Sequence, residues 1–172
     1  MDGKSFTEIR HIGTCRVNYN GRDMGYTQGG VTVKITTEWV DINVDSYGVV
    51  PIDAQDKGTT IEATTPLPQT SLENYNDAYD TSVLGNVARG MGAEDRLHFG
   101  RIVGTSINKH RLVLDPINES DGIVMYAAGA FDVDELGYTN EGVRILNIHW
   151  KAFISEDRAD GDRLFRIFGG MS

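Results

Sequence analysis

Four histidines and one cysteine are the side chains of this sequence that could ligate a metal or act as a nucleophile. His11, His98, His110 and His149 are spread along the chain and share no metal-ligand spacing. Cys15 lies in strand-like sequence with no activating pattern nearby. We therefore predict ordinary structural histidines, a buried structural thiol, and neither a metal site nor a catalytic residue.

Acidic residues gather at two places that could bind calcium through carboxylate oxygens. After Asp132, Leu136 stands where an oxygen ligand belongs and Val143 stands where the bidentate glutamate belongs, so this pattern fails. The second cluster is EDRADGD, residues 156–162, whose composition is typical of a solvated turn. Neither cluster predicts a bound ion.

The glycine-rich segment Gly85–Gly92, GNVARGMG, has the composition of a phosphate-binding loop. Such a loop follows a strand and opens a helix, whereas this segment continues into Ala93, Glu94 and Asp95. A surface loop is expected instead. The sequence also lacks a nucleophile elbow, a Walker loop and a paired-carboxylate signature, so we predict neither enzymatic activity nor a cofactor.

The composition restricts the partners of the chain. Its 172 residues include 25 acidic and 16 basic side chains, which gives a net charge of −9. A surface of this charge repels phosphate backbones and anionic lipids, which argues against a conventional nucleic-acid binder. The N-terminus has no apolar signal-peptide core, and the apolar run from Ile123 to Phe131 is shorter than the roughly 18 residues that a membrane helix needs. One soluble domain that is not secreted is expected.

A long amphipathic strand is the first element that would position polar side chains. The glycines of GYTQGG, residues 25–30, allow the chain to reverse before a β-branched run begins at Val31. Apolar and polar residues then alternate with period two, which predicts one buried and one solvated face. After Trp39 the apolar phase slips by one residue, which predicts a bulge or a bend. The polar positions before the slip are Thr32, Lys34, Thr36 and Glu38.

A second long pair of strands is predicted at Gly122–Val133 and Val143–Ile154, joined through the turn sequence LGYTNEG. The last strand again has two unlike faces. Its apolar face carries Leu146, Ile148, Trp150, Ala152 and Ile154, and its polar face carries Asn147, His149 and Lys151.

Shorter elements connect these strands. A first strand is expected over Glu8–Tyr19, followed by a turn at Asn20-Gly21 and by antiparallel pairing with the strand from Val31. The segment Tyr47–Lys57 is predicted to be a long loop with a role of its own. Further strands are expected at Thr59–Thr65, Leu97–Val103, Arg111–Ile117 and Leu164–Phe168.

One helix is predicted after the two prolines Pro66 and Pro68, which take the chain out of the sheet. Thr70 and Glu73 have the spacing of a capping box, and Ser71 can serve as the alternative cap. The helix is expected to run to about Tyr79.

Long strands with one polar face allow two interpretations. Strands of more than ten residues leave long edges, which invite pairing with another chain unless something covers them. Subunits could join edge to edge into one continuous barrel whose polar faces line a wide, wet channel. Alternatively, the chain is a monomeric antiparallel sandwich whose polar faces meet bulk water. The pattern alone leaves both open.

The order of motifs from Gly25 to Asn74 resembles the major tail tube protein of long-tailed bacteriophages. The motifs are GYTQGGVTV, the amphipathic strand ending at Val44-Asp45, YGVVPID from Tyr47, a proline-bounded segment, and SLEN at Ser71–Asn74. The long strand Val143–Ile154 and the ending FRIFGG at Phe165–Gly170 match more loosely, and residues 85–120 show no match. The family is related in fold to the tube protein of type VI secretion.

The resemblance implies a mainly β fold, an antiparallel sandwich or half-barrel with long hairpins and one flanking helix, which closes with other subunits into a barrel-shaped ring. Stacked rings, six subunits each in the family, form the conduit through which phage DNA is ejected. The chain would be one tail-tube domain over residues 1–172, without the C-terminal immunoglobulin-like domain of some relatives. It would be located in the virion after assembly in the host cytoplasm.

Partners and surface residues follow from the same resemblance. The partners would be other copies of the chain, the tape measure protein, and the tail terminator and distal tail proteins, with transient passage of duplex DNA and no membrane. An acidic wall suits such passage because it gives DNA no counterion release. The predicted channel-lining residues are Thr32, Lys34, Thr36, Glu38, Asp132, Asp134, Asn147, His149 and Lys151, the aspartates offsetting the lysines. The predicted contacts between stacked rings are Tyr47, Val49, Val50, Pro51, Ile52, Asp53, Gln55 and Lys57.

Two other functions remain as alternatives. One is the tube protein of a contractile tail or a secretion machine, which would have a sheath gene alongside. The other is a monomeric binding module, such as a carbohydrate-binding sandwich, whose platform would consist of Trp39, Trp150, Tyr47 and Tyr138. Because both tryptophans lie on apolar strand faces, the pattern favours the core for them.

Overall fold

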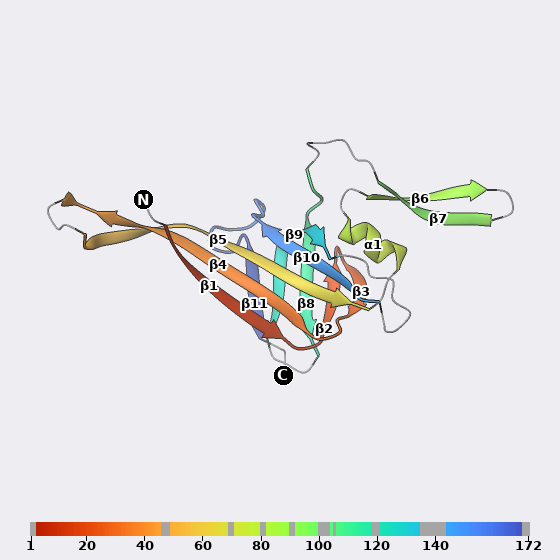
Figure 1. The fold of residues 1–172 in the computed structure, drawn as a ribbon, viewed down its shortest axis with the longest axis horizontal. Helices are drawn as coiled ribbons and strands as arrows, with labels where there is room; N and C mark the ends of the chain where they lie inside the picture. Colours follow the sequence, from red (N-terminus) through yellow and green to blue (C-terminus); the bar gives the residue numbers. More distant parts are fainter. Residues whose placement is uncertain are drawn as a thin grey trace.

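The computed structural model describes residues 3–45, 49–68, 71–79, 82–89, 92–99, 104, 106–117, 121–134 and 144–169. Within them the chain is mainly antiparallel β-structure with a single short helix (Figure 1). The elements are β1 Gly3–Ile12, β2 Cys15–Tyr19, β3 Arg22–Tyr26, β4 Val31–Asn43, β5 Pro51–Leu67, α1 Leu72–Ala78, β6 Ser82–Arg89, β7 Gly92–Phe99, β8 His110–Pro116, β9 Asp121–Val133, β10 Leu146–Phe153 and β11 Phe165–Gly169.

Nine of the strands form one sheet in the order β1-β4-β5-β10-β9-β8-β2-β3, with β11 pairing β9 outside this path. Figure 1 shows β1, β4 and β5 crossing in front of β8, β9 and β11, so the sheet curls over itself. The sheet does not close, because β1 and β3 at its two ends do not pair with each other. β6 and β7 form a separate two-stranded sheet.

The core lies inside the curl and receives alternate residues from most strands of the large sheet. Trp150 at its centre is fully buried, and its ring lies 4.6 Å from the ring of Tyr19. The indole Nε1 donates a hydrogen bond to Thr65 Oγ1 at 2.8 Å, which satisfies the one polar atom of the side chain. The expected apolar face of β10 is confirmed, since Leu146, Ile148, Trp150 and Ala152 are all buried. Ile154, just past the strand end, is exposed.

β10 and β11 occupy one strand position beside β9, interrupted by an excursion of the chain. Phe153 ends β10 opposite Ala127, and Phe165 begins β11 opposite Met125. The predicted turn EDRADGD lies in this excursion. The predicted strand Leu164–Phe168 is confirmed as β11, shifted by one residue.

The hairpin β4–β5 corrects the prediction of a long loop at Tyr47–Lys57. Residues 51–57 continue β5 and pair with the distal part of β4, for example Val40 with Gln55 and Asp41 with Ala54. The expected irregularity at Trp39 is confirmed: the register shifts between Glu38 and Trp39. The extra residue of this bulge is on the partner strand, because Glu38 pairs with Gly58 and Trp39 pairs with Asp56.

We define the arm as residues 39–43 of β4 and 51–57 of β5, together with the connecting residues Val44, Asp45, Val49 and Val50. Figure 1 shows the arm projecting beyond the rest of the sheet. Seven residues of β5 extend past Gly58, which corresponds to about 23 Å of strand.

Two other predictions about the chain path were wrong. The expected strand Glu8–Tyr19 is two strands, since β1 ends at Ile12 and β2 begins at Cys15, and the two lie at opposite ends of the sheet order. The expected loop at 85–92 is largely strand, because residues 82–89 pair with 92–99 in register. Glycine content suggested a loop there, but pairing with a neighbouring strand overrides local propensity.

The turn and helix predictions are better matched. Asn20 and Gly21 have positive φ of 53° and 77°, the backbone of a tight hairpin turn, and they join β2 to the short strand β3. The long strand β4 pairs antiparallel with β1. Helix α1 begins after Ser71, whose Oγ accepts a hydrogen bond from the Asn74 backbone NH at 3.2 Å. Ser71, the predicted alternative, is therefore the N-terminal cap, and Thr70 lies outside the described residues. The helix ends at Ala78, one residue before the expected end, with Tyr79 as its C-terminal cap.

Candidate functional site: a polar sheet face, two unlike edges and an arm

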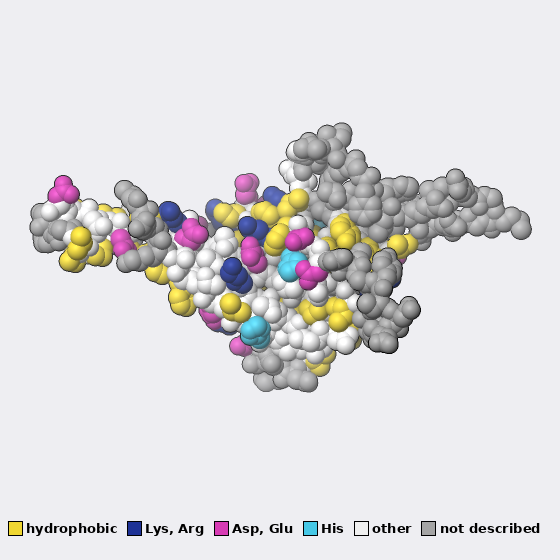
Figure 2. Space-filling model, in the orientation of Figure 1, with side chains coloured by type: hydrophobic (Ala, Val, Ile, Leu, Met, Phe, Trp, Pro, Cys, Tyr) yellow, Lys and Arg dark blue, Asp and Glu magenta, His cyan; other side chains and the backbone are white. Residues whose placement is uncertain are grey.

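A largely polar face covers the outer side of β1, β4, β5 and β10, with Ile9 of β1 as an exposed apolar residue within it. Strand register places the outward residues of these strands in rows that cross the sheet, while their neighbours point into the core. Figure 2 shows acidic, basic and histidine side chains interspersed with uncharged atoms over this region. We define the polar face as Thr7 and His11 of β1, Thr32, Lys34, Thr36 and Glu38 of β4, Thr60, Glu62 and Thr64 of β5, and Asn147, His149 and Lys151 of β10.

One row of the polar face is linked by hydrogen bonds. His11 pairs with Thr32, Thr32 with Thr64, and Thr64 with His149. Thr32 Oγ1 lies 3.3 Å from His11 Nδ1, and Thr64 Oγ1 lies 3.0 Å from His149 Nδ1. On the far side, His149 Nε2 lies 2.8 Å from Asp134 Oδ1. Short polar side chains therefore bind one another across the strands and leave few long, mobile groups on this row.

A second row corrects the expected charge balance. Lys34 pairs with Glu62, and Glu62 pairs with Lys151, so one carboxylate lies between two lysines. Lys151 Nζ is 3.9 Å from Glu62 Oε1. We expected Asp132 and Asp134 to offset the lysines, but Asp134 contacts His149 and Asn147 instead. Glu62 alternates with Thr60 and Thr64 along β5, and only the pairing of β5 with β4 and β10 brings it beside the two lysines.

Asp134 is held at the end of β9 by two polar side chains. It accepts a hydrogen bond from Asn147 Nδ2 at 2.8 Å, besides its contact with His149. The contact with His149, reinforced by Asn147, lowers the pKa of the Asp134 carboxyl below its ordinary value, against a smaller opposing effect of burial. Asp132 also lies outside the core, where its Oδ1 accepts from the Val133 backbone NH.

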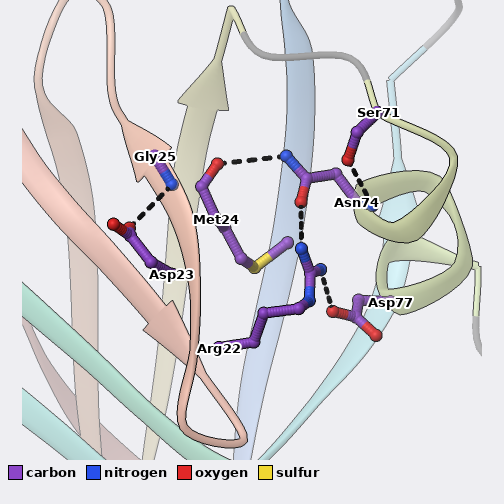
Figure 3. A network of polar contacts seen from close by, with 7 residues as sticks. All are labelled: Arg22, Asp23, Met24, Gly25, Ser71, Asn74 and Asp77. Carbon is purple, nitrogen blue, oxygen red and sulfur yellow. Dashed lines mark hydrogen bonds and ion pairs between the residues drawn. The ribbon is translucent and has the colours of Figure 1, made fainter.

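The β3 end of the sheet is covered by α1 through a network of polar contacts (Figure 3). Asn74, which is 2% exposed, donates from Nδ2 to the backbone carbonyl of Met24 at 3.0 Å. Arg22 donates to Asn74 Oδ1 at 2.8 Å and forms an ion pair with Asp77. A side chain of the helix thus binds a backbone group of the edge strand, which makes this carbonyl unavailable to a further strand.

The β1 end of the sheet has no such cover in the described part of the chain. Among the described strands, β1 pairs with β4 alone. Phe6 and Ile9 are 59% and 57% exposed, and Glu8 and Arg10 form an ion pair of 2.6 Å on the face that elsewhere holds core residues. An open cleft of about 320 Å³ separates this strand from Ile123 and Ile167 on the opposite side of the curl. The backbone groups along this edge are therefore accessible to a further strand.

The arm exposes apolar residues at its end. Val49, Val50 and Ile52 are 94%, 61% and 54% exposed. Of the predicted ring-stacking residues, Val49, Val50, Pro51, Ile52, Asp53, Gln55 and Lys57 all lie on the arm, and Tyr47 lies outside the described residues. Clustered exposed apolar side chains on a projecting element are typical of a contact surface.

The described residues contain no arrangement suited to metal binding, and no helix among them is long and apolar enough to cross a membrane. Cys15 is buried, as predicted, and its thiol donates to the Gly13 carbonyl at 3.2 Å.

Of the proposed sugar platform, Trp150 is buried and Trp39 is half-buried on the arm, while Tyr47 and Tyr138 lie outside the described residues.

Comparison of the sequence with models of protein families, and with curated proteins, finds no match.

Proposed function

We propose that this chain is a tail tube protein, which polymerises as stacked rings into the conduit for DNA ejection from a long-tailed bacteriophage. Six subunits per ring is the number that the family resemblance implies. The observation that carries the proposal is the polar face, which extends over four neighbouring strands with one exposed apolar residue, Ile9, in its β1 part, and ends at strand β1.

The chemistry of the polar face suits the wall of a channel for DNA. Threonines whose hydroxyl groups are hydrogen-bonded to neighbouring side chains form a smooth, uncharged surface. Glu62 lies beside Lys34 and Lys151, the two lysines that could otherwise bind phosphate. With a net charge of −9 per subunit, the ring as a whole repels the duplex. DNA then moves along the wall without the counterion release that makes protein binding favourable.

The two ends of the sheet support closure into a ring. An uncovered β1 edge offers backbone donors and acceptors to a strand of the neighbouring subunit. A ring requires that β1 pair with a different edge of the neighbour, because pairing of two β1 edges would give a closed dimer. Among the described strands, β11 pairs with β9 alone and so offers such an edge. The arm then makes contacts between stacked rings.

Electron microscopy of Glu38→Lys protein tests the wall assignment. Glu38 is exposed on the polar face, so we expect normal tubes and slower DNA passage, measured as ejection rate from particles that carry the variant. Glu156→Lys, which makes the same charge change on the exposed turn beyond β10, is the matched control and should eject at the normal rate. Equal ejection by both variants would contradict the placement of the polar face in the channel.

A further inference from the structure

A second surface, on the outer side of β2, β8, β9 and β11, combines arginines with an apolar floor. Three adjoining hollows of about 250, 560 and 370 Å³ lie here, and Arg111 lines all of them. We define the arginine groove by its rim, Arg16, Arg111, Arg158 and Arg166, and by its floor, Val113, Val124, Tyr126 and Phe168. It differs from the polar face, which carries threonines and lysines in place of arginines and aromatic rings.

Three of the four guanidinium groups of the groove are held by carboxylates: Arg16 pairs with Asp23 at 2.6 Å, and Arg158 and Arg166 share Asp162. Asp162 accepts hydrogen bonds from Tyr126 Oη at 2.7 Å, Arg158 at 2.8 Å and Arg166 at 2.9 Å. Arg158 also stacks 3.6 Å above the Tyr126 ring. Arg111 is exposed; its backbone carbonyl accepts from the Asn20 NH at 2.9 Å, while its guanidinium has no hydrogen bond or ion pair to another described residue. Asp115, Asp157 and Asp162 also line the hollows, so Arg111 is the groove cation that no carboxylate of the described chain neutralises. It lies beside the apolar floor, and this combination suits a segment with exposed carboxylates and apolar side chains.

The arm has the complementary composition. It carries Asp41, Asp45, Asp53 and Asp56 against a single basic residue, Lys57, and its end exposes Val49, Val50 and Ile52. Asp53 and Asp56 are exposed, and each uses one oxygen on a nearby backbone NH, of Ala54 and Gly58 respectively. The second carboxylate oxygen of each remains available for a guanidinium.

We propose that the arm of one copy of this chain binds in the arginine groove of a second copy. Figure 1 shows the arm projecting away from β8, β9 and β11, so an arm meets a groove only on another molecule. Donor and acceptor surfaces differ, so each bound copy presents a further arm and a further groove, and the contact extends an assembly. The inference rests on the proposed function only in requiring self-association, and it names the receptor for the arm.

Charge exchange between the two surfaces tests this contact. In sedimentation velocity at a fixed concentration of the full chain, we expect Asp53→Lys with Asp56→Lys, and separately Arg111→Glu, to weaken association at least tenfold. Combining all three substitutions in one chain should restore association, because attraction returns with opposite signs. Arg111→Lys, and Asp53→Glu with Asp56→Glu, keep the charges and should behave as the unaltered chain. Val113→Glu on the half-buried floor should reproduce the Arg111→Glu loss independently.

Mixing the two single-surface variants separates this inference from the tube proposal. The arm variant retains an intact groove and the Arg111→Glu variant retains an intact arm, so the mixture forms a one-to-one complex that neither forms alone. That complex, or rescue by the combined variant, supports the arm contact even if microscopy of the unaltered chain finds no hollow rings. Normal association of both variants, or no rescue in the combined variant, overturns the arm contact even if the unaltered chain forms tubes.

Discussion

The two halves of the β4–β5 hairpin have the same strand pairing but unlike surroundings. In the half near the body, Val33 and Ile61 are fully buried while Thr32 and Thr64 stay on the polar face. Beyond the bulge at Gly58, residues 51–57 of β5 are all exposed, and no other strand of the described chain covers this part except the beginning of β1. The first half is therefore stabilised by the fold, and the second half contributes little to it.

This difference assigns stability and assembly to separate residues. Burial of apolar area is the main favourable term in folding, and the arm buries little within one molecule. A long exposed hairpin with apolar residues at its end is a liability for a monomer, because it invites association. Its presence is explained if association is its role.

The largest expected effect distinguishes the two tryptophans, one in each region. Trp150→Ala removes a fully buried ring and the hydrogen bond to Thr65, so we expect a loss of about 3–5 kcal/mol in the free energy of unfolding. Trp39→Ala, on the half-exposed arm, should cost less than about 2 kcal/mol. Urea unfolding of both variants at low protein concentration measures this contrast, and equal losses would contradict the division between body and arm.

The covered sheet edge should show the next largest effect. Asn74→Ala removes the donor to the Met24 carbonyl and the acceptor for Arg22, both part of a buried contact. We expect the free energy of unfolding to fall by about 1–3 kcal/mol. The variant should also expose β3, so hydrogen exchange at the Met24 amide should accelerate more than exchange in β9. Unchanged protection of β3 would mean that α1 does not cover this edge.

The arm itself should barely affect stability. Replacing Val49, Val50 and Ile52 together with threonine removes exposed apolar groups only, so the free energy of unfolding should change by less than about 0.5 kcal/mol per site. Association should nevertheless be reduced, as read from sedimentation velocity. A variant that unfolds more easily but still assembles normally would reverse the roles that we assign to the two regions.

The smallest expected effect concerns Asp134 and depends on pH. Its pKa is lowered in the folded state, so the carboxylate contributes stability above its unfolded pKa of about 4, and this contribution is lost as the pH falls through the folded value. Because the side chain is 50% exposed, solvent screening limits the contribution to less than about 1 kcal/mol. Asp134→Asn should thus be slightly less stable at pH 7, and the difference should shrink as the pH falls below about 4. A difference that stays constant over this pH range would indicate another cause.

Local sequence patterns predicted the elements that have a strong signal of their own. The apolar face of β10, the slip at Trp39 and the Asn20-Gly21 turn each have a strong local signal, and each is found. The sequence pattern does not show the break between β1 and β2, because Gly13 and Thr14 are a weak turn signal. At this point the chain passes from one end of the strand order to the other.

The candidate site was predictable only in part. Period two placed Thr32, Lys34 and Thr36 on one face, but only the register with β5 shows Glu62 beside the lysines. The local pattern predicts a loop over Tyr47–Lys57 because Gly48, Pro51 and polar residues interrupt it, whereas strand pairing tolerates Pro51 as the first residue of β5. The arginine groove joins residues from four strands and an excursion, which no local pattern can bring together.

Cryo-electron microscopy of the concentrated, purified chain tests the central claim most directly. The account predicts closed rings or hollow tubes in which β1 of each subunit pairs with a neighbouring subunit and the polar face, with Thr32, Thr36 and Asn147, faces the channel. A uniform population of single molecules, or tubes whose channel is lined by other residues, would contradict it.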